Sequence, residues 1–205
     1  MAETPSSQTS ELQEGLLTAC DGCGPLLQRD YWAVIDGCTL SPPVLIQTVA
    51  ERFMELPPED LVTFTREPGA QGPLVLGEEI MVRIRMAGAC RVRLVHRNEQ
   101  SLTLATLPGH PEAGRITFGA YRNDAGDVIF HIRSRARSST HANYVGFLTA
   151  GDPMQTATWT DFVASVANSF GNGVVGRVYA ETETKDEGAL VNEDACSPTF
   201  LAVGG

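Results

Sequence analysis

Hydrophobic and polar residues alternate in short segments through the middle of the chain, a pattern that predicts β-strands. Val82, Ile84 and Met86, for example, share one face of such a segment, and Arg83 and Arg85 share the other. The segments with strand character are 29–35, 61–66, 77–86, 89–98, 101–107, 115–121 and 128–137. The last five are joined by only two to seven residues, whereas parallel neighbours need crossovers of about a dozen residues or more. They therefore predict an antiparallel meander with one apolar face and one arginine-rich face.

Two other segments show helical spacing. The first can be capped by Ser41 and begins at Pro42 and Pro43, and its apolar residues recur every three or four positions. Its predicted apolar stripe comprises Val44, Ile46, Val49, Phe53 and Leu56. The second helix is predicted over 152–173, with a stripe of Trp159, Phe162, Val163, Val166 and Phe170. An alternating segment at 174–184 predicts one more strand after this helix.

This order of elements predicts an α+β fold, in which a curved antiparallel sheet wraps around a C-terminal amphipathic helix. A length of 205 residues suits a single domain. We place that domain at 29–184, between a flexible acidic N-terminal tail, 1–28, and an acidic C-terminal tail, 185–205. Because a curved sheet cannot fill its own concave side, the space between sheet and helix must be either a packed core or a cavity.

Charge and composition narrow the classes of function. The net charge of −10 opposes nucleic acid and anionic membranes as partners, although 79–138 holds ten arginines against five acidic residues. No apolar run approaches the roughly 18–20 residues that span a bilayer, and the acidic start does not resemble a secretory signal, which predicts a cytoplasmic protein. Five cysteines, including the isolated Cys20-Asp-Gly-Cys23 pair, make no complete metal or redox motif. We therefore predict neither a metal site nor a cofactor.

The loop LPGHPEAG, 107–114, carries the first candidate site. His110 and Glu112 lie two residues apart on a backbone restricted by Pro108 and Pro111. An imidazole near a carboxylate suits proton transfer, with the carboxylate fixing the tautomer and the other ring nitrogen facing a ligand, so both residues are predicted to be catalytic. The alternative is that these side chains only hold the loop against the neighbouring strand.

Four more residues are candidates for contacting a ligand. Arg115 and Tyr121 lie in the strand just after the loop, and Trp159 lies on the helix that faces the sheet. Tyr144, in a polar segment after the last strand of the meander, could cover the mouth of a pocket. The sequence thus predicts that the ligand site is formed by the loop, the following strand and the second helix.

His131 and Arg133 alternate with Phe130 and Ile132, so they lie on the opposite face of their strand, and the alternation does not say whether that is the concave or the outer face of the sheet. On the concave face they would bind a carboxylate, enolate or phenolate. On the outer face the arginine would simply be solvated, which is favoured because burying unpaired guanidinium groups is costly. Both residues are retained as ligand-binding candidates.

The order of elements resembles the START-like, polyketide-cyclase-like helix-grip superfamily. The loop residues Leu107 to Glu112, followed by Gly114, are similar to an uncharacterised domain-of-unknown-function family, with a resemblance that extends over 75–140. The recurring positions of that family fall here on Cys90, Gly109, His110, Pro111, Glu112, Gly114, Phe130, Ile132, Arg133 and Ser138. Two features depart from these patterns: His131 replaces a usual acidic residue, and the strand after the last helix is not expected of a helix-grip fold.

Three functions remain open. The first is an enzyme that binds a small hydrophobic, carbonyl-bearing molecule and catalyses a cyclisation or isomerisation without a cofactor, in a biosynthetic pathway. His110 or Glu112 would move the proton, and Arg115 or Tyr121 would stabilise developing negative charge. The second is a carrier or sensor that holds such a molecule without reaction. The third is an interaction domain whose arginine-rich face binds an acidic partner.

Overall fold

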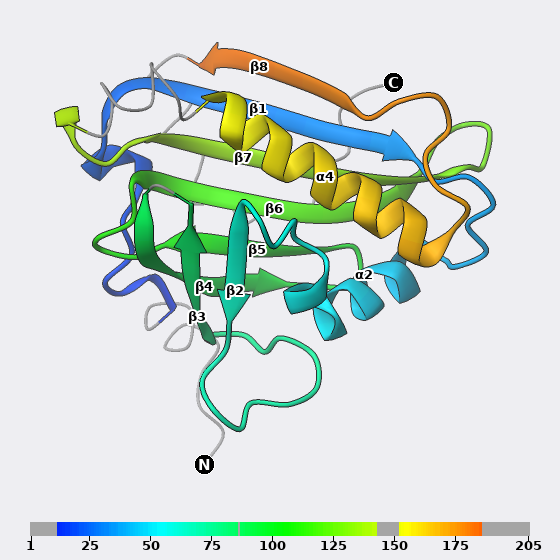
Figure 1. Cartoon of the computed structure of the whole chain (residues 1–205), viewed down its shortest axis with the longest axis horizontal. Helices are drawn as coiled ribbons and strands as arrows, with labels where there is room; N and C mark the ends of the chain where they lie inside the picture. The colour runs from blue at the N-terminus through cyan, green and yellow to red at the C-terminus, as the bar shows by residue number, and fades with distance from the viewer. Residues whose placement is uncertain (1–11, 86, 143–151, 186–205) are drawn as a thin grey trace.

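The computed structural model describes residues 12–85, 87–142 and 152–185. Within these residues, eight strands form one antiparallel sheet in the order β2-β3-β4-β5-β6-β7-β1-β8 (Figure 1). The strands are β1 (Cys23–Val34), β2 (Val62–Thr65), β3 (Glu79–Ile84), β4 (Gly88–Arg97), β5 (Ser101–Thr106), β6 (Glu112–Arg122), β7 (Val128–Ser138) and β8 (Tyr179–Lys185). The predicted meander is β3 to β7, so each strand pairs with the next one in the sequence.

Two α-helices cover the concave side of the sheet (Figure 1). The long helix α4 (Asp152–Phe170) contacts β1 and β7, and α2 (Pro42–Glu51) contacts β5 and β6. Short 3₁₀ helices, η1 (Ala19–Asp21) and η2 (Phe53–Glu55), precede β1 and follow α2. The predicted fold class, a curved antiparallel sheet around a C-terminal helix, is confirmed.

The first helix differs from its prediction in three respects. It ends at Glu51, with Arg52 as its C-cap, and the remaining predicted turn is the separate η2. Ser41 occupies the N-cap position, but its side chain makes no capping hydrogen bond. Val44 is exposed, because Leu45 and Ile46 face the core at this end of the helix.

At one edge of the sheet, β1 is longer than the predicted strand, and the strand predicted after the second helix pairs with it. β1 starts at Cys23, so the predicted tail boundary at residue 28 falls inside a strand, and Leu26 is fully buried there. Sequence composition missed this extension because only part of the segment is buried, and its place in the sheet depends on pairing with β7. The strand predicted after the second helix is present as β8, which pairs with β1 at the edge of the sheet.

The core lies between the sheet and the two helices, and aromatic rings fill one end of it. Phe53 packs edge-on against Phe118, with ring centroids 5.1 Å apart. Phe162 of α4 lies 5.2 Å from Phe118 and stacks on Phe130. These large side chains pack together beneath α4 at this end of the core.

Candidate functional site

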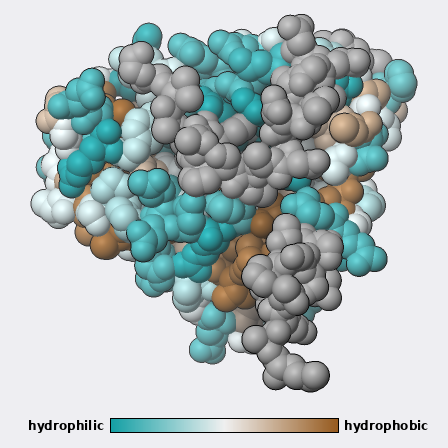
Figure 2. All heavy atoms as spheres, turned by 180° about the vertical axis from the view of Figure 1, so that it is seen from behind, coloured by the Kyte–Doolittle hydropathy of each residue, from teal (hydrophilic) through white to brown (hydrophobic). Residues whose placement is uncertain are grey.

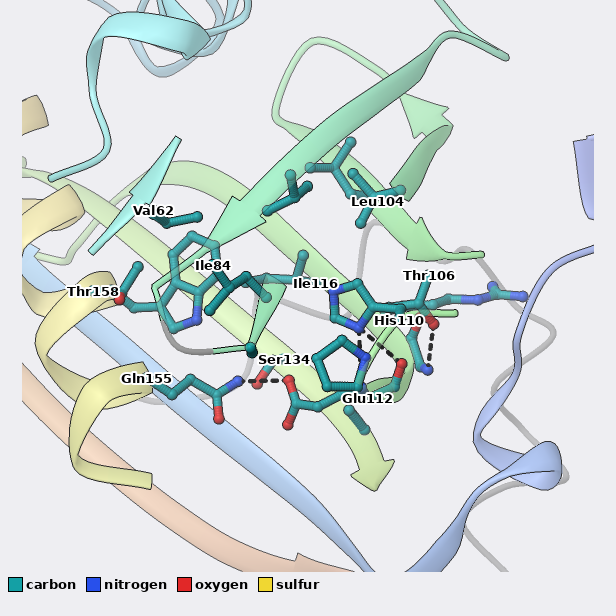
Figure 3. A pocket seen from close by; sticks show the side chains of 18 of the residues that line it. Val62, Ile84, Leu104, Thr106, His110, Glu112, Ile116, Ser134, Gln155 and Thr158 are labelled. Carbon is teal, nitrogen blue, oxygen red and sulfur yellow. Dashed lines mark hydrogen bonds between the residues drawn. The ribbon is translucent and has the colours of Figure 1, made fainter. Parts of the chain in front are cut away.

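A cavity of about 510 Å³ lies between the inner face of the sheet and the N-terminal half of α4 (Figure 3). This volume is within the range of about 300–1,000 Å³ that is typical of small-molecule sites. Its walls are mainly aliphatic and aromatic, and include Val62, Phe64, Val82, Ile84, Val92, Leu104, Ile116 and Trp159. Ala87 and Ala142, which also line it, are exposed, so the cavity reaches the surface beside them.

The cavity exists because small side chains face this half of α4. Thr106, Gly114, Ser134 and Ala136 occupy inward positions on β5, β6 and β7, where the other half of the sheet carries phenylalanines. Gly114 has a φ of 154° and pairs with Ala136 so closely that even a Cβ atom would meet the Arg135 carbonyl oxygen. These inward positions therefore carry no side chain large enough to fill the space.

One end of the cavity is polar, and Glu112 is its centre (Figure 3). The Oε2 atom of Glu112 accepts a hydrogen bond of 2.9 Å from Nε2 of Gln155 on α4. Its Oε1 atom lies 3.4 Å from Nη1 of Arg29 on β1, whose side chain is only 1% exposed. Ser134 pairs with Arg29 across β1 and β7, so it joins the same polar end. An ion pair thus links the start of β6 to β1, and an amide ties it to α4.

Three polar atoms of the cavity wall have no hydrogen-bond partner among the described residues. They are Oγ of Ser134, Oε1 of Gln155 and Nε1 of Trp159, all buried. An ionised Glu112 carboxylate can accept hydrogen bonds but cannot donate them. The Gln155 amide must therefore turn its nitrogen towards Glu112 and its oxygen away from it. Buried polar groups are normally paired. This end of the cavity therefore offers one donor, one acceptor and one hydroxyl group.

His110 lies on the cavity wall, on the turn that Gly109 forms with a φ of 94°. Its Nδ1 atom lies 3.0 Å from the backbone nitrogen of Glu112 and 2.9 Å from the Glu112 carbonyl oxygen. The predicted contact between ring and carboxylate is not what the structure has: the backbone of Glu112 holds the ring, while its carboxylate binds Gln155 and Arg29. Burial lowers the pKa of His110 from 6.5 to about 4, against the opposing effect of the backbone hydrogen bond, so the ring is neutral at pH 7.

The low pKa of His110 gives a testable pH dependence. Between pH 6.5 and about 4 the unfolded chain protonates this ring and the folded chain does not, so stability falls as the pH is lowered through this window. The full effect is at most about 3 kcal/mol in the free energy of unfolding. We expect urea unfolding of His110→Asn, measured at several pH values, to depend less on pH in this window than unfolding of the unchanged protein. Parallel curves would contradict the assignment.

Arg115 lies at the wall of the cavity, but its guanidinium group points elsewhere. Its Nη2 atom donates a hydrogen bond of 2.9 Å to Oε1 of Gln13, in the segment before η1. The same segment bonds to the sheet through Leu17, whose carbonyl oxygen accepts from Thr106 Oγ1. Arg115 thus ties the N-terminal segment to β6, and the prediction that it contacts a ligand stays a prediction.

Tyr121, His131 and Arg133 lie on the outer face of the sheet, away from the cavity, because Phe130 and Ile132 face the core. They surround Asp30, to whose Oδ1 atom His131 Nε2 and Arg133 Nε lie at 2.6 and 2.5 Å. The hydroxyl of Tyr121 lies 3.4 Å from His131 Nδ1. Burial alone would raise the pKa of Asp30, but hydrogen bonds from His131 and Arg133 outweigh this effect and hold the pKa of Asp30 below its usual range. The sequence favours this outer placement but predicts that Arg133 is solvated there; in the structure Arg133 is buried and binds Asp30.

The remaining candidate residues are Trp159, Tyr144 and Cys90. Trp159 lines the cavity, as predicted, and its ring also contacts Phe118. Tyr144 lies outside the described residues. Burial, and then the charge of Glu112, raise the pKa of Cys90 to about 11, so this thiol stays protonated at neutral pH. In the described part of the chain, no three His, Cys, Asp or Glu side chains lie close enough to hold a metal ion together.

Sequence reasoning missed Arg29, Ser134 and Gln155. The alternation of β7 contained the signal for Ser134, which shares a face with Phe130 and Ile132. Arg29 and Gln155 had no such signal, because their partner Glu112 is 83 and 43 positions away in the sequence. These contacts depend on how the strands and the helix assemble.

Comparison with known proteins identifies the family. Residues 55–165 match the family described as "Domain of unknown function (DUF1990)". The chain belongs to this family. The predicted resemblance to an uncharacterised family is therefore confirmed, and every residue that lines the cavity falls within the DUF1990 match. Arg29, on β1, precedes it. No curated protein sequence is significantly similar to the chain.

Solved structures show the fold. The KanY protein (ms6282) is 8% identical, with a TM-score of 0.50 over 72% of this chain and 99% of that one. Protein Ms6760 from Mycobacterium smegmatis is 9% identical, with a TM-score of 0.47 over 69% and 89% of the two chains. Ara h 8.0201 is 12% identical, with a TM-score of 0.45 over 72% and 98%. At such identities the likeness concerns the fold alone, and the KanY structure agrees with the helix-grip arrangement of this DUF1990 chain.

Proposed function

We propose that this chain binds a small, largely apolar molecule in the cavity between the sheet and α4. The observation that carries the proposal is a cavity of about 510 Å³ with apolar walls and a single polar end at Glu112, Gln155 and Ser134. Apolar walls supply affinity through burial, and a few placed polar groups supply orientation. The donors Trp159 Nε1 and Ser134 Oγ suit a carbonyl oxygen on the bound molecule.

Binding without reaction agrees better with the site than proton transfer does. A histidine with a pKa of about 4 is a poor general base at neutral pH. The carboxylate of Glu112 is already engaged by Gln155 and Arg29. Catalysis by His110 or Glu112 therefore stays a prediction, and turnover that is lost in His110→Gln while affinity is kept would establish it.

The arginine-rich outer face offers less for an acidic partner than its sequence indicates. Arg91 and Arg93 both bind Glu79, at 2.7 Å each, and Arg133 binds Asp30. Figure 2 shows hydrophilic side chains over much of the coloured part of this side of the molecule. Because several of its arginines already bind carboxylates of the same chain, a role in binding an acidic protein has less support than the cavity. No helix in the described ranges is both long and apolar enough to cross a bilayer.

Filling the cavity tests the proposal directly. Ala136 lines the cavity, so Ala136→Phe places a ring in the space that the ligand would occupy. We expect it to weaken binding of the neutral fluorescent probe N-phenylnaphthylamine by about tenfold or more. The matched control, Ala180→Phe, changes an exposed position on β8 and should bind the probe as the unchanged protein does.

The same test has clear contrary results. Equal weakening by both variants, with thermal unfolding showing that both are folded, would place the probe outside the cavity. No binding of the probe by the unchanged protein, together with native mass spectrometry that finds no retained small molecule, would overturn the proposed function.

A further inference from the structure

We infer that the bound molecule has an uncharged polar head group that both accepts and donates hydrogen bonds, as an amide or an alcohol does. This inference rests on the proposed function and concerns the polar end of the same cavity. It is carried by the three buried atoms without partners among the described residues, Ser134 Oγ, Gln155 Oε1 and Trp159 Nε1.

The hydrogen-bonding capacity of these atoms sets the first requirement. An indole nitrogen can only donate, an amide oxygen can only accept, and a hydroxyl group can do both. A head group that satisfies Trp159 must contain an acceptor, and one that satisfies Gln155 must contain a donor. Water can meet the same groups, but a ligand that displaces water without replacing its hydrogen bonds loses affinity. An ammonium group lacks the acceptor, and a carboxylate lacks the donor.

The charges around this end of the cavity set the second requirement. Glu112 lines the cavity, and its carboxylate balances the buried guanidinium of Arg29. The amide oxygen of Gln155 adds a partial negative charge at this end of the cavity, and the neutral ring of His110 supplies no positive charge. Arg115 also lines the cavity, but its guanidinium group binds Gln13, so a carboxylate head would be desolvated beside Glu112. An ammonium head would approach Glu112 but would meet the charge of Arg29 and the donor of Trp159.

Probes that share a body and differ in the head group test the inference. Decanamide, decanol and decanoate form a flexible set, and the naphthalene carboxamide, methanol and carboxylate form a rigid set. We expect the amide and the alcohol of at least one set to displace N-phenylnaphthylamine at about tenfold lower concentration than the carboxylate, at pH 8. Two bodies are used so that a failure of shape is not mistaken for a failure of the head group.

Two variants connect that preference to the named atoms. Ser134→Ala removes only the hydroxyl group, whereas Trp159→Phe removes the indole donor together with part of the ring that lines the cavity. Because the loss of ring area affects every probe, the informative quantity is the ratio of amide affinity to carboxylate affinity, and each variant should lower this ratio about fivefold. Trp32→Phe, on the outer face where Trp32 stacks on Tyr179, is the matched control and should leave both affinities unchanged.

The outcomes separate the inference from the proposed function. If no probe of either set binds and N-phenylnaphthylamine also fails, the proposed function is wrong. If the probes bind with equal affinity, or the carboxylate binds best, the cavity holds apolar molecules and the inference about the head group is overturned. A preference for the amide that Trp159→Phe and Ser134→Ala leave intact would also overturn it.

Discussion

Gly114→Ala is expected to lower the free energy of unfolding by about 2–6 kcal/mol, the sum of backbone strain and overpacking. The backbone here has a φ of 154°, and an added Cβ would lie 2.1 Å from the Arg135 carbonyl oxygen and 2.7 Å from Ala136 Cα. The strand cannot simply move away, because the Gly114 nitrogen lies 3.0 Å from Thr106 Oγ1 and 3.1 Å from the Leu17 carbonyl oxygen. Equilibrium unfolding in urea measures the loss.

Gly109→Ala is the matched control for this prediction. Gly109 also has a positive φ, 94°, but nothing lies within 4 Å of the position that its Cβ would take. Its replacement should therefore cost only the conformational strain, about 1–2 kcal/mol. If both variants lose the same stability, close approach of β6 and β7 is not what requires glycine at position 114.

These two glycines explain part of the LPGHPEAG loop on structural grounds. Gly109 forms the turn, Gly114 allows β6 to lie close to β7, and His110 bonds to the backbone of its own loop. The carboxylate of Glu112 reaches out of the loop, to β1 and α4. The loop is thus held together locally, as the structural interpretation of the motif expects, while one of its side chains joins distant elements; the catalytic interpretation stays a prediction.

The sheet and α4 were predictable because each buries one face. That burial leaves alternating residues in β3 to β7 and a stripe at helical spacing in α4. The first six residues of β1 were not predicted, because their strand conformation depends on pairing with β7 and they show no regular alternation of buried and exposed positions. The break between α2 and η2 was missed for a related reason: Phe53 continues the apolar stripe although the helix has already ended.

The candidate site was predictable only where it is local in sequence. His110 and Glu112 were found from their loop, and Trp159 from its helix, and all three line the cavity. The placement of His131 on the outer face follows from alternation with Phe130 and Ile132. Alternation does not reveal its partner Asp30, which is 101 positions away. The ion pair at the polar end of the cavity, between Arg29 and Glu112, likewise joins residues far apart in sequence, 83 positions from each other.

That ion pair carries the second large prediction. Glu112→Ala removes the carboxylate that faces the buried guanidinium of Arg29, and it also removes the acceptor for Gln155. Because a buried charge is left without this counter-ion, we expect the free energy of unfolding to fall by about 3–5 kcal/mol. Arg29→Met should cost a similar amount, since it removes the guanidinium that lies 3.4 Å from the carboxylate. Urea unfolding of each variant at pH 7 gives both values.

The double variant decides whether these losses come from the pair or from packing. Replacing a buried ion pair by apolar side chains of similar volume is often close to neutral, so Arg29→Met with Glu112→Leu should lose less than the sum of the losses of Arg29→Met alone and Glu112→Leu alone. We expect a coupling energy of about 1–3 kcal/mol, in the range for residues in contact. Additive losses would show that Arg29 and Glu112, 3.4 Å apart, stabilise the fold independently.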